Sequence, residues 1–378
     1  MDRPDKKIGI LTFHCVQNYG AMLQAYALKG YLCQEGYDAR IINYRSSAIL
    51  APYEVSMSLA QAAGRRVIVF PWRWPESLKT LHWVKTHPQE QIGRREKFRR
   101  FEEEYLLDPG ASPVPYEEIG RLPVDAFIFG SDQIWNTDIT GEEEDVYWGL
   151  FPTEGQKRIV YGASLSHREL RPAEQRNIQR CLSSFDAVSV REKALAEKVE
   201  ELTGQRVPVV VDPTLLLSRE DYERSLPLSP PGVEPYVLLY MMRDSEEAMK
   251  AAKRTGLPVK IVGCRIGEHF IDVGPGKILN AGPIEFLNLA YHAKYIITNS
   301  FHGTVFSILF QRPFCVISGE DDRIDNLLRL AGLEKARIPD AGAFSPGCFV
   351  QSTEDTFQRL RQMIDLSKGY LKNALSGG

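Results

Sequence analysis

The 378-residue sequence has no strong excess of charge of either sign and no long apolar segment. It carries 46 Lys and Arg residues against 49 Asp and Glu residues, a formal net charge of −3. A dedicated nucleic-acid-binding protein is usually strongly basic, so we do not expect nucleic acid as a partner. No apolar run approaches the roughly 20 residues that a membrane-spanning helix needs. We therefore expect a cytoplasmic protein.

Cysteine is scarce, and its distribution indicates no metal site. None of the six cysteines forms a Cys-x-x-Cys pair, and no histidine cluster lies beside one at the spacing of zinc ligands. Most of them fall in apolar runs, where an unpaired cysteine is usually a small buried side chain. We expect a protein without a bound metal.

Strand-like apolar runs alternate with helical patterns along most of the chain, which predicts an α/β fold with parallel sheets. The expected strands are 7–13, 41–44, 124–130, 159–166, 187–192, 207–217, 236–242, 259–264, 294–300 and 313–317. Helices are expected between them, including 21–35, 172–184, 245–255, 283–292 and 301–310.

The pattern predicts two Rossmann-like domains that face each other across a cleft. A proline-rich stretch at 218–235 is the best linker candidate. It separates a domain at 1–225, with an insertion at about 46–110, from a second domain at 235–350. A last helix at 353–373 is expected to return to the first domain. Ligands of open parallel sheets bind beyond the carboxyl ends of the strands, so polar residues at those ends are the candidates for a site.

Two polar segments follow predicted strands in the first half. Backbone amides at the helix that follows residues 14–20 suit an anion, and the alternative is an ordinary polar turn. The candidate binding residues there are Asn18, Tyr19 and Gly20. In the second segment Asp132 is the candidate for chemistry, and a role as a helix cap is the alternative. The residues around it that predict a sugar or phosphate pocket are Ser131, Gln133, Trp135 and Asn136.

Two more segments complete the candidate site. Arg191 and Glu192 end a strand, where a guanidinium can hold a carboxylate or phosphate; an Arg–Glu surface pair is the alternative. His302 lies at a strand–helix junction and can act as a general acid or base near neutral pH, unless it is a core histidine. Its neighbours Asn299, Ser300 and Gly303 and the downstream Arg323 are further candidates.

The chain resembles the polysaccharide pyruvyl transferase family over nearly its whole length. The resemblance rests on motifs whose order and spacing match that family: NYG at 18–20 with LQAYAL at 23–28, GSDQIWN at 130–136, YGASLS at 161–166, SVRE at 189–192, DPTLLL at 212–217, and NSFHG at 299–303 with Pro313-Phe314.

The resemblance implies a pair of domains like those of GT-B glycosyltransferases, and phosphoenolpyruvate as the donor substrate without another cofactor. The pyruvyl carbon would become a ketal that bridges two hydroxyls of a sugar. Such a reaction needs an acid–base group and cations for the donor's carboxylate and phosphate. The resemblance thus implies His302 as the acid–base group, Arg191 as the anion clamp, and Asp132 as a second base or a ligand of the acceptor hydroxyl.

One position departs from the family pattern. Characterised members carry Arg-Leu-His where this chain has Ser300-Phe301-His302. Ser300 cannot supply the charge-assisted contact that an arginine makes to phosphate. Either Arg323 or Arg265 compensates, or the chain uses another donor.

Residues 64–100 interrupt the α/β pattern and are basic. They hold ten basic against three acidic residues, together with Trp72, Trp74 and Trp83. Such a segment suits the surface of an anionic membrane, where it would meet a lipid-linked acceptor at the inner face. An ordinary subdomain with its tryptophans packed inward is the alternative.

Two other functions fit the same architecture. A nucleotide-sugar-dependent glycosyltransferase would need a nucleotide pocket in the second half, and the glycine-rich stretch 263–276 leaves room for one. A non-catalytic protein that binds sugar or phosphate is the other alternative, although His302, Arg191 and Asp132 together exceed what simple binding requires.

Overall fold

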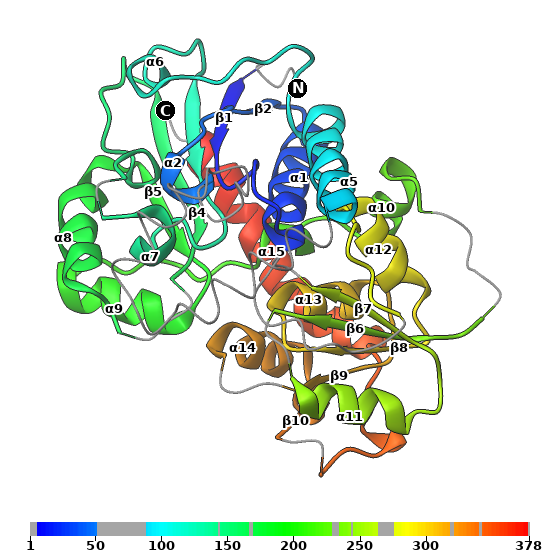
Figure 1. Ribbon diagram of the computed structural model, residues 1–378. Coiled ribbons are helices and arrows are strands. Elements are labelled where there is room, and N and C mark those ends of the chain that lie inside the picture. Colours follow the sequence, from blue (N-terminus) through cyan, green and yellow to red (C-terminus); the bar gives the residue numbers. More distant parts are fainter. Residues whose placement is uncertain are drawn as a thin grey trace, which may run out of the picture.

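The computed structural model describes residues 6–50, 88–142, 144–165, 169–228, 234–242, 245–263, 276–317, 321–339 and 342–376. Within these ranges the chain forms two five-stranded parallel sheets, each with helices packed around it (Figure 1). The prediction of two α/β domains with parallel sheets is confirmed.

The first sheet has the strand order β2-β1-β3-β4-β5. All four residues of β3 are apolar and buried, as expected for a parallel strand covered on both faces. The strands are β1 (Lys7–Leu11), β2 (Asp38–Ile41), β3 (Ala126–Phe129), β4 (Lys157–Ala163) and β5 (Ala187–Val190). The helical segments of this half are α1 (Tyr19–Gln34), α2 (Ser47–Leu50), α5 (Pro88–Phe101), the π-helix η3 (Glu102–Leu106), α6 (Tyr116–Ile119), α7 (Thr137–Thr140), η4 (Val146–Trp148), α8 (Pro172–Cys181), η5 (Leu182–Ser184), α9 (Lys193–Thr203), η6 (Pro213–Leu215) and α10 (Arg219–Ser225).

The second sheet has the order β10-β9-β8-β6-β7. Its strands are β6 (Val237–Met241), β7 (Val259–Gly263), β8 (Tyr295–Thr298), β9 (Phe314–Ile317) and β10 (Arg337–Ile338). The helical segments are α11 (Glu246–Arg254), α12 (Pro283–His292), α13 (Phe301–Leu309), α14 (Asp322–Ala331), η7 (Glu334–Ala336), η8 (Pro346–Cys348) and α15 (Glu354–Ser376).

The segment 207–217 differs from the strand that its apolar residues predict. Its β pairing with the first sheet is an isolated bridge between Val190 and Val209, and it then forms the 3-10 turn η6. Pro213 has no backbone N–H to donate to a ladder, and the side chain of Asp212 accepts the N–H of Thr214 instead. This turn places Asp212 close to the ends of β4 and β5.

An aromatic cluster joins the two domains. The ring of Tyr19, at the start of α1, stacks on Phe286 of α12 with centroids 4.8 Å apart and lies 5.9 Å from Tyr240 of β6. All three rings are buried. The first turn of α1 is thereby fixed against the second domain.

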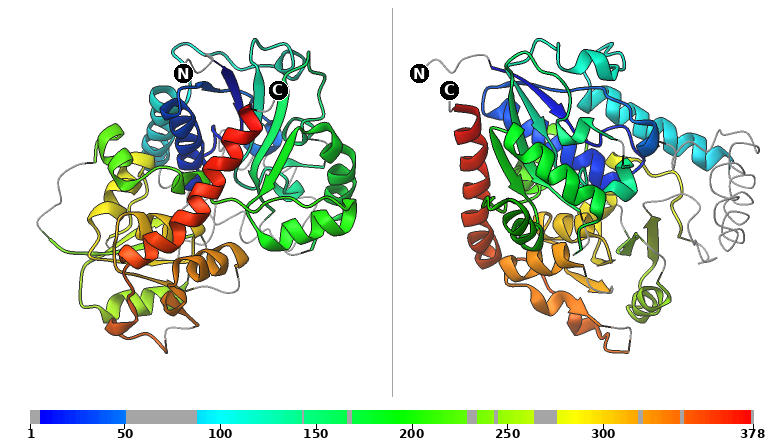
Figure 2. Two further views of the ribbon diagram at one scale, coloured as in Figure 1. Left: turned by 180° about the vertical axis from the view of Figure 1, so that it is seen from behind. Right: turned by 90° about the vertical axis from the view of Figure 1, so that its left-hand side faces the viewer.

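Helix α15 runs from the second domain back to the first sheet (Figure 2). Ser367 Oγ accepts the backbone N–H of Val211 at 2.9 Å, and the Tyr370 hydroxyl donates to the carbonyl of Val160 at 2.8 Å. Near the end of the helix, Lys6 Nζ donates to the carbonyl of Leu375 at 2.7 Å. The helix therefore links the second domain to the first sheet.

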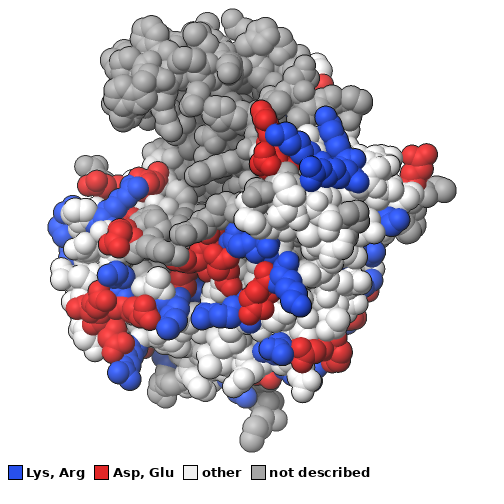
Figure 3. Space-filling view, turned by 90° about the horizontal axis from the view of Figure 1, so that it is seen from below, with Lys and Arg blue, Asp and Glu red and all other residues white. Residues whose placement is uncertain are grey.

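Helix α5 contains the described part of the basic segment, and residues 64–87 of that segment lie outside the described residues. Arg94 is buried in the domain interface, and Lys97 pairs with Glu285 of α12 at 2.8 Å. On the face seen in Figure 3, acidic and basic side chains are interspersed. In the described ranges, no helix is long and apolar enough to span a membrane.

Candidate functional site

Polar residues from the strand ends of both domains meet where the domains touch. Asp132 follows β3, Ser164 follows β4, and Arg191 and Glu192 follow β5. From the second domain, His302 lies in the first turn of α13, directly after β8. The candidate catalytic residues His302, Arg191 and Asp132 are thus brought into one cluster, with Asp212 at its centre.

His302 faces a buried carboxylate. Its Nε2 lies 3.5 Å from Oδ2 of Asp212, whose side chain is fully buried. Asp212 also accepts the N–H of Thr214 at 3.0 Å and its hydroxyl at 2.6 Å. Burial alone raises the pKa of Asp212, but His302, Arg191 and Thr214 together hold that pKa well below its usual range. Asp212 is therefore an anion beside the imidazole, and His302 Nε2 has no hydrogen-bond partner among the described residues.

Arg191 is enclosed by side chains of the cluster. It donates to Asp212 through Nη1 and to Ser164 Oγ at 3.1 Å through Nη2, and Nη2 lies 3.7 Å from Asp132 Oδ1. Its guanidinium carbon lies 4.9 Å from the centre of the Phe301 ring. Because Arg191 is only 4% exposed, its charge acts mainly on the carboxylates around it.

Asp132 and Ser131 lie on a tight turn after β3. Asp132 has a φ of 69°, a left-handed conformation that is uncommon for a residue other than glycine. Its carboxylate is nearly buried beside Arg191. Ser131 Oγ donates to the carbonyl of Gly162 at 2.8 Å, so its hydroxyl holds the turn against β4.

A chain of buried polar contacts connects Glu192 to His302. The Ser164 hydroxyl donates to Oε1 of Glu192 and accepts from Arg191, which in turn donates to Asp212. Burial raises the pKa of Glu192, and Arg191 offsets part of this effect. The second oxygen of Glu192, Oε2, is buried and has no hydrogen-bond partner among the described residues.

Arg323 approaches the same cluster from α14. Its guanidinium carbon lies 5.8 Å from the centre of the Phe301 ring, so Arg191 and Arg323 both contact this ring. Arg323 donates to both oxygens of Asp321, at 3.1 and 2.8 Å. Burial lowers the pKa of Arg323, but Asp321, Glu192 and Asp132 together raise it above its ordinary value. Arg323 is more exposed than Arg191, and its charge is shared with one close carboxylate.

The loop before α1 makes room for His302, and two of its backbone amides are already bonded and so not open to an anion. Asn18 Oδ1 accepts the N–H groups of Gly20 and Ala21 at 3.0 and 3.3 Å, so two amides at this helix start are already bonded. The Tyr19 side chain lies in the interdomain core. A β-carbon on Gly20 would lie 2.0 Å from Nδ1 of His302, so Gly20 makes room for the imidazole.

Trp135 and Asn136, two other candidates in 130–136, hold the local structure together. Trp135, a candidate for a sugar pocket, is fully buried and stacks on Trp148 at 5.1 Å, so its ring belongs to the core. Asn136 caps α7 and donates to Gln133 Oε1 and to the carbonyl of Leu165, each at 2.9 Å.

The residues around His302 also shape the start of α13. Ser300 is the N-cap of the helix, and its Oγ accepts the Gly303 N–H at 3.4 Å. Gly303 packs so closely that a β-carbon there would lie 2.3 Å from Thr298 Oγ1. Asn299 Oδ1 accepts the Met242 N–H at 2.6 Å and ties β8 to β6.

Three members of the cluster were missed by the sequence analysis: Asp212, Ser164 and Phe301. Asp212 stands between Val-Val-Val and a Leu-Leu-Leu run, and a carboxylate inside such an apolar stretch must be paired when it is buried. That pattern was the available signal. Arg265 and most of 263–276 lie outside the described residues. Among the described residues, no group of three or more His, Cys, Asp or Glu side chains is placed to hold a metal ion.

Residues 18–321 match the family model for polysaccharide pyruvyl transferase. No curated protein matches the chain. Solved structures similar to it include a putative UDP-N-acetylglucosamine 2-epimerase from Listeria monocytogenes, at 10% identity and a TM-score of 0.51, with 98% of this chain and 91% of that chain covered. S. aureus MnaA with UDP shares 12% identity at a TM-score of 0.46, covering 97% and 90%. Identities this low show the fold alone. Because the family match extends over most of its length, the chain belongs to the polysaccharide pyruvyl transferase family.

Proposed function

We propose that the protein transfers the pyruvyl group of phosphoenolpyruvate to a sugar of a cell-surface polysaccharide or of its lipid-linked precursor, forming a pyruvate ketal. Membership of the family makes the chain a transferase. The observation that carries the finer proposal is His302, which lies against the buried carboxylate of Asp212 with Arg191 and Arg323 nearby.

His302 is the proposed acid in the first step. It gives a proton to the methylene carbon of phosphoenolpyruvate, and a sugar hydroxyl forms a bond to the neighbouring carbon. Phosphate then leaves, and a second hydroxyl closes the ketal. The two hydroxyl protons balance the new methyl hydrogen and the proton on phosphate. Asp212 stabilises the protonated imidazole, as a buried carboxylate beside a catalytic histidine does.

Arg323 is the proposed contact for the anionic donor. Ser300 occupies the position where characterised family members have an arginine. It is uncharged and caps α13. Arg191 donates to Asp212 and Ser164, so we assign it chiefly to holding these groups in place. Arg323 is the more exposed of the two guanidiniums on the Phe301 ring and can make a charge-assisted bond to phosphate or carboxylate.

Two measurements test this proposal against its alternatives. Phosphoenolpyruvate should raise the melting temperature of the protein, because a ligand that binds only the folded state stabilises it. Stabilisation by UDP-sugars and not by phosphoenolpyruvate would support a glycosyltransferase instead. Stabilisation without phosphate release in the presence of sugars would support a non-catalytic binding protein.

Variants at His302 and Arg191 test the assigned roles. His302→Gln should lower the rate of phosphate release by about 10²–10⁴-fold, as expected for loss of a general acid. His292→Gln, at the end of α12, is the matched control and should keep the wild-type rate. Full activity of His302→Ala or Arg191→Ala would contradict the assignment.

A further inference from the structure

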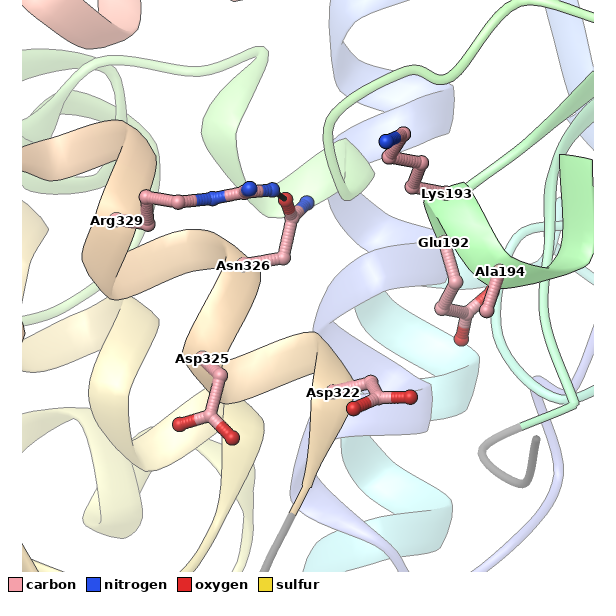
Figure 4. Close-up of a pocket in the computed structure, with 7 residues that line it drawn as sticks. All are labelled: Glu192, Lys193, Ala194, Asp322, Asp325, Asn326 and Arg329. Carbon is pink, nitrogen blue, oxygen red and sulfur yellow. Dashed lines mark hydrogen bonds between the residues drawn. The ribbon is translucent and has the colours of Figure 1, made fainter. Parts of the chain in front are cut away.

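A pocket of about 310 Å³ lies between the start of α9 in the first domain and one face of α14 in the second. Figure 4 shows the carboxylates of Glu192 and Asp322 near one end of it, with Lys193 and Arg329 toward the other. The α14 residues that line it are Asp322, Asp325, Asn326 and Arg329. Their spacing of three and four residues puts them on one face of the helix.

The side chain that points to a ligand here is Glu192. Its residue is 6% exposed and lines the pocket, and Oε2 has no hydrogen-bond partner among the described residues. A buried carboxylate oxygen without a partner is costly, because it has lost water and gained no donor. Oε2 is closed to water in this structure, so a hydroxyl in the pocket can supply that donor once the side chain of Glu192 turns toward it.

Glu192 is also connected to the candidate catalytic cluster. Its other oxygen, Oε1, accepts from Ser164, and the contacts continue through Arg191 and Asp212 to His302. Arg323, on the same helix as the pocket residues, faces the Phe301 ring. The pocket and the proposed donor contact are therefore neighbours on α14.

We propose that this pocket holds a hexose unit of the acceptor, with Oε2 of Glu192 binding the attacking hydroxyl and taking its proton. This inference rests on the proposed pyruvyl transfer. The hydroxyl O–H bond breaks as its oxygen bonds to the pyruvyl carbon, and the proton on Glu192 then passes to the departing phosphate. Asn326 and Arg329 donate hydrogen bonds to other hydroxyls, and Asp322 accepts one. A sugar that contacts both α9 and α14 also bridges the two domains.

The raised pKa of Glu192 supports this role. The groups that face it are Arg191 and Ser164 of the first domain and Arg323 and Asp321 of the second. Burial raises the pKa above its ordinary value although two guanidiniums lower it. A carboxylate with a raised pKa is a stronger base toward a hydroxyl.

Sugar binding is the first test, and it does not depend on the reaction. Saturation-transfer NMR on the full chain would use the methyl glycosides of glucose, galactose and mannose as probes. At least one should bind, and Asn326→Ala and Arg329→Ala should weaken its binding at least tenfold. Absence of binding by all three, or binding unchanged in both variants, overturns the pocket assignment.

Turnover is the second test, with Glu192→Gln compared with Glu201→Gln, an exposed residue of the same helix. Glu192→Gln keeps the shape of the side chain but cannot take the proton. We expect wild-type thermal stabilisation by phosphoenolpyruvate and a fall in kcat of at least 100-fold, with Glu201→Gln unchanged. Wild-type kcat in Glu192→Gln overturns the role of Glu192 alone. Absence of any effect of phosphoenolpyruvate on the wild-type protein instead overturns the proposed function.

Discussion

A β-carbon on Gly20 would lie 2.0 Å from Nδ1 of His302, so the missing side chain at Gly20 is what allows the imidazole to reach Asp212. Gly20 lies in the first turn of α1 and His302 in the first turn of α13, so this contact joins the two domains at the candidate site. The position of His302 therefore depends on a residue of the other domain.

Gly20→Ala should displace the imidazole from Asp212. Misplacing a catalytic group by about 1 Å can cost on the order of 10²-fold in rate, so we expect a large fall in kcat for phosphate release. Gly30→Ala in the same helix is the control, because its β-carbon would lie 3.5 Å from Leu217, an ordinary contact. Equal activity of the two variants would show that His302 does not need this space.

Trp135 should act through stability and not through sugar binding. Its fully buried ring stacks on Trp148, so Trp135→Ala should lower the free energy of unfolding by about 3–5 kcal/mol. Trp135→Phe should cost roughly 1–3 kcal/mol and leave KM unchanged. Urea unfolding and acceptor kinetics on the same samples measure both quantities. A raised KM for the acceptor in Trp135→Phe at wild-type stability would show instead that Trp135 takes part in acceptor binding.

The sequence predicted the fold well because apolar runs and helical periodicity are local. The strand at 126–129 and the helix at 283–292 follow directly from such patterns. The segment 207–217 was predicted as a strand for the same reason, because its valines favour one. Pro213 and the capping side chain of Asp212 turn the chain there instead. Local propensity cannot show which of these effects prevails.

The candidate site was predicted in part. Strand ends indicated His302, Arg191 and Asp132, since loops after parallel strands gather at one edge. The contact of His302 with Asp212 depends on how the two domains dock, and the contacts of Arg191 depend on how the first domain folds; no local pattern encodes either. In the chain, Arg191 lies 21 residues before Asp212 and 27 residues after Ser164, so these contacts are not local.

Arg94 should be needed for stability although it belongs to a basic segment. Its guanidinium carbon lies 4.8 Å from the centre of the Tyr19 ring, and it donates to the carbonyls of Gln17 and Ala281 at 3.2 and 3.3 Å. Arg94→Ala leaves buried carbonyls with fewer donors, so we expect a loss of about 3 kcal/mol in urea unfolding. Arg95→Ala, at an exposed position, should stay within about 0.5 kcal/mol.

Two variants at exposed basic residues of α5 test the proposed membrane contact through residues 64–100. If the exposed basic residues of α5 meet anionic lipid, Arg95→Ala and Arg100→Ala should reduce flotation with liposomes that contain phosphatidylserine. Lack of flotation by the wild-type protein at low salt would contradict the proposal.

Glu102 should make stability depend on pH. Its carboxylate accepts from Arg45 and lies 3.8 Å from Nε2 of His14. Burial raises the pKa of Glu102 from 4.5 to about 7, although Arg45 lowers it. Burial likewise lowers the pKa of His14 from 6.5 to about 4, so this imidazole stays neutral in the folded protein. As pH rises, the shift of Glu102 lowers the free energy of unfolding and the shift of His14 raises it. A variant of Glu102 is needed to separate the two effects.

The free energy of unfolding of the wild-type protein should fall relative to Glu102→Gln as pH rises. A raised pKa means that the folded protein holds the proton more tightly, so this contribution is complete below pH 4.5 and is lost as pH rises through 7. The difference between wild type and Glu102→Gln should decrease by about 2.5 kcal/mol from pH 5 to pH 8. His14 contributes equally to both proteins in this comparison, apart from its coupling to Glu102. A difference between wild type and Glu102→Gln that stays constant from pH 5 to pH 8 would mean that Glu102 is ionised throughout this range.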